Sequence, residues 1–156
     1  MSEMNHLTED GTVRMVDVGA KEVTHRRAVA VAGVAMSEAT TDRLFSGDLP
    51  KGDALATVRI AAIQATKRTP DLIPLCHPLQ ISAVDVAVER SDAGATISVA
   101  VELDGRTGVE MEAMTGAAVG ALTMYDMIKG IDRSAEVAFV RLLAKSGGAS
   151  GEWNRE

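Results

Sequence analysis

The chain has 156 residues, one cysteine and a formal net charge of −6, and only 3% of its residues are aromatic. That length fits one domain, whose core must consist of aliphatic side chains and methionine. A single cysteine excludes an internal disulfide, and the acidic charge argues against broad binding to nucleic acid or to an anionic membrane. No apolar run reaches the roughly 18 residues of a membrane span, and no signal-peptide pattern follows Met1, so we expect a cytoplasmic protein.

The first quarter of the chain predicts a tail, a strand and a short helix. Residues 1–11 are polar and aperiodic, which is typical of a frayed end. Valine at alternate positions predicts a strand over residues 26–36. A short helix is expected over residues 37–46, ending near Gly47.

A second helix and a proline-rich segment follow. Asp53 is placed to cap a helix over residues 54–68, and Pro70 ends it. Residues 67–79 hold three of the four prolines, and each proline ring restricts backbone direction. This rigidity suits a preformed pocket, and the same segment carries Cys76 and His77.

The next patterns predict an antiparallel hairpin and a final strand. Apolar and polar residues alternate in residues 79–90 and again in residues 96–103, with turn residues between them. A last strand is expected over residues 137–143. Together with the helices, these elements predict an α+β fold, with an antiparallel sheet and helices packed on one face.

A long helix is predicted over residues 107–130. Thr107 and Glu110 match the spacing of a capping box, and we favour that role for Glu110 over a catalytic one. No charge occurs in residues 113–125, so the helix should be buried nearly all round. Small residues in this stretch indicate close packing, which we assign to a contact between subunits: Gly116, Ala117, Gly120 and Ala121.

Charged residues lie only at the ends of this helix. For Glu112, favourable interaction with the helix dipole and a functional role are equally good interpretations. Asp126 and Lys129 fit either an i,i+3 ion pair or a proton-transfer couple. Glu112 and Asp126 are separated by about 21 Å along a continuous helix, so a site using both requires a second chain.

Other chemistries fit less well. Neighbouring residues in an extended segment point to opposite sides, so Cys76 and His77 do not form a thiol dyad, and Cys76 is better interpreted as buried and inert. His77 fits a satisfied polar residue as well as a ligand contact. The three histidines and one cysteine form no zinc pattern, and no phosphate-loop or dinucleotide fingerprint occurs. Basic residues near the ends of elements could gather around one small anion.

Five segments of the chain are distinctive: Met15-Val-Asp-Val18, Lys51-Gly-Asp53, residues 67–79, residues 105–130 and Arg141-Leu-Leu-Ala-Lys-Ser-Gly-Gly148. They closely resemble the MoaC family, the cyclic pyranopterin monophosphate synthases of molybdenum-cofactor biosynthesis. The resemblance spans about residues 12–151, which we take as a single catalytic domain followed by a tail over 152–156. One departure is Ala149, which stands where many members carry Lys in a Ser-Gly-Gly-Lys-Ser-Gly tail, so no role is assigned to this tail.

The resemblance implies a ferredoxin-like fold, a homohexamer built as a trimer of dimers, and sites between subunits. It also implies a lyase that converts 3′,8-cyclised GTP to cyclic pyranopterin monophosphate and releases diphosphate, with no cofactor or metal expected. The residues it implies as catalytic are Asp126, Lys129 and Lys51, with Lys51 also a candidate for the polyphosphate. The residues it implies as substrate contacts are Leu75, Cys76, His77, Met111, Glu112 and Arg26.

Two alternatives use the same fold without this reaction. A nucleotide-sensing module would use the basic residues only to bind, and would show no turnover. A sheet that binds RNA fits poorly, because the predicted strands lack stacking aromatic residues.

Overall fold

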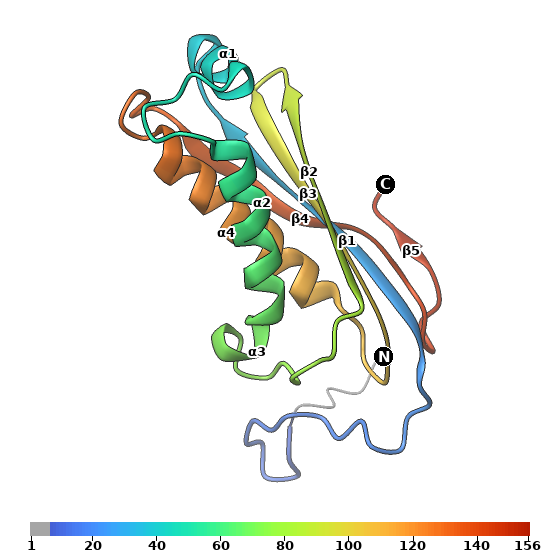
Figure 1. Ribbon diagram of the computed structural model, residues 1–156. Helices are drawn as coiled ribbons and strands as arrows, with labels where there is room; N and C mark the ends of the chain where they lie inside the picture. The colour runs from blue at the N-terminus through green and yellow to red at the C-terminus, as the bar shows by residue number, and fades with distance from the viewer. Residues whose placement is uncertain (1–6) are drawn as a thin grey trace.

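The computed structural model describes residues 7–156 and arranges them as an antiparallel sheet with helices on one face (Figure 1). The strand order is β2-β3-β1-β4-β5, and every neighbouring pair is antiparallel. This order and the sequence of elements match the ferredoxin-like arrangement, so the predicted α+β class is confirmed. The strands are β1 (Thr24–Ala35), β2 (Ala83–Ser91), β3 (Gly94–Gly105), β4 (Glu136–Ser146) and β5 (Trp153–Asn154).

Helices α1 and α2 begin at residues whose side chains cap them. The Ser37 and Asp53 side chains accept hydrogen bonds from the backbone N–H groups of Thr40 and Ala56, at the starts of α1 and α2. Gly47 ends α1 with a φ of 77°, a left-handed conformation that glycine adopts at no steric cost. The helices are α1 (Glu38–Ser46), α2 (Ala54–Lys67), α3 (Thr69–Leu72) and α4 (Glu110–Ile128). None of them is long and apolar enough to cross a membrane.

The core lies between the sheet and the pair of helices α2 and α4. Alternate residues of β1 and β3 point toward the helices, as the period of two in these strands requires. Ala113, Ala117 and Ala121 of α4 are fully buried against them. Short side chains on both surfaces let the helix and the sheet approach closely. The core residues of these strands are Ala28, Ala30, Ala32, Val34, Ala95, Ile97, Val99, Val101 and Leu103.

The small residues of α4 pack within one chain, so their predicted place at a subunit contact is wrong. A Cβ at Gly116 would lie 2.8 Å from Thr66 Cγ2 and 3.2 Å from the Ala62 carbonyl oxygen, both in α2. A Cβ at Gly120 would lie 3.2 Å from Ile97 Cγ2 of β3. The uncharged stretch did indicate burial, but α2 and the sheet of the same chain supply the covering surface.

Some predicted boundaries also differ from the structure. The long helix begins at Glu110, and its N-cap, Val109, has no side-chain capping bond, so the predicted capping box does not form. The first strand of the hairpin, β2, begins at Ala83, four residues after its predicted start. Pro70 follows the end of α2, as predicted, and it also lies in the first turn of α3. At that position its missing N–H costs nothing.

The chain ends add smaller features. Of the predicted tail over residues 1–11, residues 1–6 lie outside the described residues, and Leu7 forms an isolated bridge with Val13. At the other end, Trp153 pairs with Lys145, so β5 extends the sheet beyond β4.

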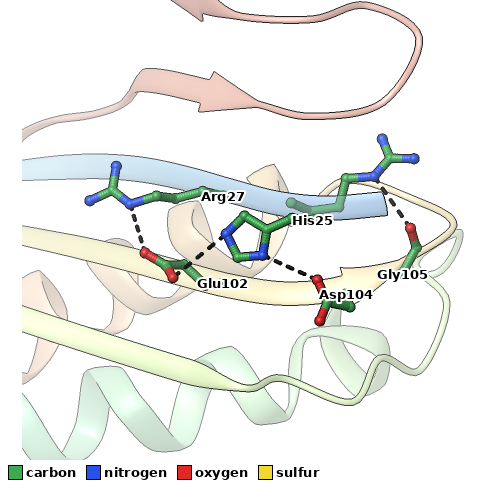
Figure 2. A network of polar contacts seen from close by, with 6 residues as sticks. His25, Arg27, Glu102, Asp104 and Gly105 are labelled. Atoms are coloured by element: carbon green, nitrogen blue, oxygen red, sulfur yellow. Dashed lines mark hydrogen bonds and ion pairs between the residues drawn. The ribbon is translucent and has the colours of Figure 1, made fainter. Parts of the chain in front are cut away.

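The open face of the sheet carries cross-strand ion pairs near the start of β1 (Figure 2). Arg27 Nε donates to Glu102 Oε1 at 2.8 Å, and His25 Nδ1 lies 3.2 Å from Asp104 Oδ1. Each pair stands directly opposite in the β1–β3 register. Their side chains are at least 37% exposed, so each pair contributes at most about 1 kcal/mol. They support the strand register, and none of these four side chains lines the two clefts at the start of α4.

Candidate active site

A cleft of about 650 Å³ lies at the N-terminal end of α4. Its walls come from the proline-rich segment, the start of α4 and an N-terminal segment that includes Val16 and Val18. This volume is within the usual range for small-molecule sites. The cleft brings together five residues singled out from the sequence: Leu75, Cys76, His77, Met111 and Glu112.

The proline-rich segment holds His77 in place through local turns and one long-range bond. The Cys76 N–H donates to the Ile73 carbonyl at 3.1 Å, which bends the chain just before His77. His77 Nε2 lies 2.8 Å from the Val16 carbonyl oxygen. A carbonyl only accepts, so Nε2 carries a proton and donates it, and Nδ1 is the nitrogen through which His77 would meet a ligand.

Glu112 is the buried carboxylate of this cleft. Glu112 is only 3% exposed. Burial raises the pKa of its carboxyl group to about 7, and the negative charge of Glu110 adds a smaller effect in the same direction. Burial and the charge of Glu112 also raise the pKa of the Cys76 thiol. A raised thiol pKa is the opposite of nucleophile activation. Cys76 is half-buried, so its predicted full burial is wrong.

A second cleft of about 670 Å³ adjoins the first and shares Lys21, Thr107, Gly108 and Glu110 with it. Its cations come from four separate segments of the chain. Sequence reasoning missed Lys21 and Arg106, because both lie in irregular segments without a periodic pattern. Arg106 directly precedes Thr107. The cations that line this cleft are Lys21, Arg26, Arg106 and Lys145.

Backbone and ion-pair contacts orient these cations. Lys145 Nζ lies 3.0 Å from Glu110 Oε1. Glu110 thus forms an ion pair with Lys145 in place of the predicted capping box. Arg26 Nε donates to the Gly105 carbonyl at 3.4 Å. A Cβ at Gly148, which has a φ of 73°, would collide with the Arg26 guanidinium. Glycine is therefore required where the chain wraps around Arg26.

A third cluster lies at the other end of α4. Lys129 Nζ is 2.7 Å from Asp126 Oδ1, and Lys51 Nζ is 3.0 Å from Asp126 Oδ2. Lys51 also donates to the Asp126 backbone carbonyl at 2.6 Å. Hydrogen bonds from Lys129 and Lys51 hold the pKa of Asp126 below its ordinary value, and Asp126 raises the pKa of Lys129. The predicted ion pair is thus present, with Lys51 as a further member.

The two ends of α4 remain separate within one chain (Figure 1). Glu112 and Asp126 lie on one continuous helix, about 21 Å apart along its axis. Within one chain, Lys51 accordingly contacts Asp126 and does not lie beside Arg26. The sequence interpretation had assigned Lys51 and Arg26 together to the polyphosphate. Among residues 7–156, no group of three or more His, Cys, Asp or Glu side chains is arranged to hold a metal ion.

The domain is ferredoxin-like, and its first cleft adjoins the second cleft, whose four cations make it a basic extension of the first. Such a site suits a small, phosphorylated ligand. The model of the MoaC family matches residues 15–148, and this chain belongs to that family.

Similar proteins support the assignment over nearly the whole chain. A cyclic pyranopterin monophosphate synthase of Roseiflexus castenholzii is 55% identical over 154 residues, which cover 97% of this chain and 98% of that protein. A protein of the same name from Corynebacterium efficiens is 50% identical over 154 residues, covering 99% of each chain. One from Herpetosiphon aurantiacus is 51% identical over 152 residues, covering 96% of this chain and 93% of that one.

Proposed function

We propose that this protein is a lyase of molybdenum-cofactor biosynthesis that converts 3′,8-cyclised GTP to cyclic pyranopterin monophosphate and releases diphosphate. Relatives with this name are 50–55% identical across nearly full length. The structural observation that supports the assignment best is the junction of two clefts, one with a buried carboxylate and one lined by four cations.

The first cleft suits the purine-derived part of the substrate. A carboxylate accepts hydrogen bonds from adjacent N–H groups, so Glu112 pairs with the amidine edge of the ring system. Leu75 and Met111 supply apolar walls, and His77 contacts the substrate through Nδ1. Cys76 contributes shape without reacting, because its thiol stays protonated.

The basic extension suits the triphosphate. Attack of a sugar hydroxyl on the α-phosphate displaces diphosphate, so negative charge develops on the leaving oxygens. Cations already aimed at that position stabilise the charge without reorganisation. Arg26 and Lys145, with Lys21 and Arg106, serve this role, and Glu110 holds Lys145 in place before substrate arrives.

Asp126, Lys51 and Lys129 carry the proton transfers. Hydrolytic opening of the imidazole ring and closure of the pterin ring both move protons, and neither requires a redox step. Asp126 is kept ionised by the two lysines and accepts a proton, while Lys129 remains protonated and donates one.

A complete site then takes its two halves from different chains. The cleft at the start of α4 in one chain joins the Lys51, Asp126 and Lys129 cluster at the end of α4 in another, since about 21 Å separates the two within one chain. This sharing requires at least two chains, and the homohexamer that we propose, a trimer of dimers as the family resemblance implies, meets that requirement.

Turnover tests this function directly. Purified protein is mixed with cyclised GTP, diphosphate is quantified, and the product is oxidised to a fluorescent pterin. We expect both products from the wild type, and a fall of about 10² to 10⁴-fold in rate for Lys129→Ala, as is typical when a general acid is lost. Arg59→Ala, on the exposed face of α2 and outside both clefts, is the matched control and should retain the wild-type rate. Tight binding of cyclised GTP without diphosphate release would instead indicate a nucleotide sensor.

A further inference from the structure

Asp132 is a buried carboxylate that lines none of the clefts. It lies in the turn between α4 and β4 and is 7% exposed. Its Oδ1 accepts hydrogen bonds from the Ser134 N–H at 3.1 Å and the Ser134 hydroxyl at 2.7 Å. Its Oδ2 accepts one from the Ser37 N–H at 2.8 Å. These bonds hold the pKa of Asp132 far below its ordinary value, so the group stays ionised although it is buried.

One oxygen of Asp132 binds the far side of the turn that follows Lys129. The N–H groups of Ile131 and Asp132 both donate to the Ile128 carbonyl, at 2.9 and 3.0 Å, so the chain reverses directly after Lys129. The bonds from Ser134 close the other side of this turn. The Asp132 carboxylate therefore closes the far side of the turn that begins at Lys129, while backbone bonds to Ile128 close its near side.

The other oxygen reaches the element that leads to Lys51. Ser37 is the N-cap of α1, and α1 runs into the loop that carries Lys51. The Gly52 N–H donates to the Leu49 carbonyl at 3.0 Å, and Leu49 is buried, so the loop is a compact turn. Ser37 and Lys51 thus lie at the two ends of one segment, which consists of α1 and this compact turn.

We propose that Asp132 is a positioning residue for the proton-transfer cluster: it clamps the start of α1 to the turn after α4, so that Lys51 and Lys129 converge on Asp126. The proposal rests on the function proposed above for these three residues. Misplacement of catalytic groups by about 1 Å can reduce a rate by about 100-fold, so such a clamp matters for turnover even though it touches no substrate.

Asp132→Asn is the decisive variant. Asparagine keeps the size and one accepting oxygen, but its amide nitrogen cannot accept the bonds on the other side. We expect kcat for diphosphate release to fall by about 10- to 100-fold with KM changed less than about twofold, because the clefts at the far end of α4 are intact.

The pH profile gives a second readout. Lys51 from the α1–α2 loop and Lys129 after α4 are the charged groups that face Asp126, and Tyr125 lies beside Lys129. Loosening the lysines raises the pKa of Asp126, so the acid limb of the kcat profile moves to higher pH in Asp132→Asn.

Ser37→Ala separates positioning from general destabilisation. It removes the side-chain cap of α1 and the minor contribution of the Ser37 hydroxyl to the low pKa of Asp132, but it keeps the backbone N–H that binds Asp132 Oδ2. We expect a lowered Tm with kcat and pH profile close to the wild type. Equal losses of kcat in Ser37→Ala and Asp132→Asn would overturn the proposal. If Asp132→Asn fails to fold, Ser134→Ala removes one donor to Oδ1 and should shift kcat and the pH profile in the same direction by less; unchanged values overturn the proposal.

A crystal structure of Asp132→Asn, or of Ser134→Ala in its place, decides the matter without turnover. The proposal requires the Lys51 to Asp126 contact, 3.0 Å in the wild type, to open beyond about 4 Å. An unchanged cluster overturns it. If the wild type itself releases no diphosphate, the proposed function fails, and this structural readout still tests the clamp.

Discussion

At the scale of single residues, Glu112 couples stability to pH. Its pKa is about 7 in the folded chain against an ordinary 4.5, because the carboxylate is buried. Below pH 4.5 both states are protonated, and burial has no electrostatic cost. As pH rises from 4.5 toward 7, the unfolded chain loses its proton first, so the free energy of unfolding falls.

We therefore predict that Glu112→Gln removes this pH dependence. The stability of the variant relative to the wild type should grow by up to about 3 kcal/mol between pH 4.5 and pH 8. Urea unfolding of both proteins across this range measures the difference, in which all other titrating groups cancel. Parallel stability curves for the two proteins would show that Glu112 does not titrate abnormally.

At the scale of elements, the contact of α4 with α2 predicts different responses at two glycines. At Gly116 a methyl group meets the Ala62 carbonyl at 3.2 Å and Thr66 Cγ2 at 2.8 Å, so Gly116→Ala should destabilise the protein by about 1–3 kcal/mol. At Gly120 the nearest atom is Ile97 Cγ2 at 3.2 Å, and the better helix propensity of alanine, about 1 kcal/mol, offsets this crowding.

Thermal unfolding of the two matched variants tests this packing. Gly120→Ala should unfold near the wild-type temperature, and Gly116→Ala well below it. A larger loss for Gly120→Ala would mean that α4 is rotated relative to α2. A leucine at Gly120 would crowd the interior of one chain, and not a subunit contact as the sequence had indicated.

At the scale of the whole molecule, shared sites predict complementation between inactive variants. Glu112→Ala and Asp126→Ala should each be inactive, yet a mixed assembly contains sites in which both residues are wild type. Subunit exchange should therefore restore part of the diphosphate release. Native mass spectrometry verifies that mixed oligomers are present. If they form without any recovery of activity, both halves of the site belong to one chain.

The sequence by itself was sufficient for features with a local period or spacing. Alternating valines indicate β1, and Asp53 indicates the start of α2, because strand pleats and helix caps depend on residues close in the chain. The i,i+3 spacing likewise brings Asp126 and Lys129 together. The α+β class follows from the order of such elements.

Only the tertiary structure decided what meets across the chain. The spacing of Thr107 and Glu110 indicated a capping box, but Lys145 from β4 lies within 3.0 Å of Glu110, and the cap does not form. The small residues of α4 indicated close packing without naming α2 as the partner. Lys21 and Arg106 gather beside Arg26 although no pattern marks them. Local sequence encodes period and spacing, whereas the neighbours of a buried face or a charge depend on the path of residues far away in the chain.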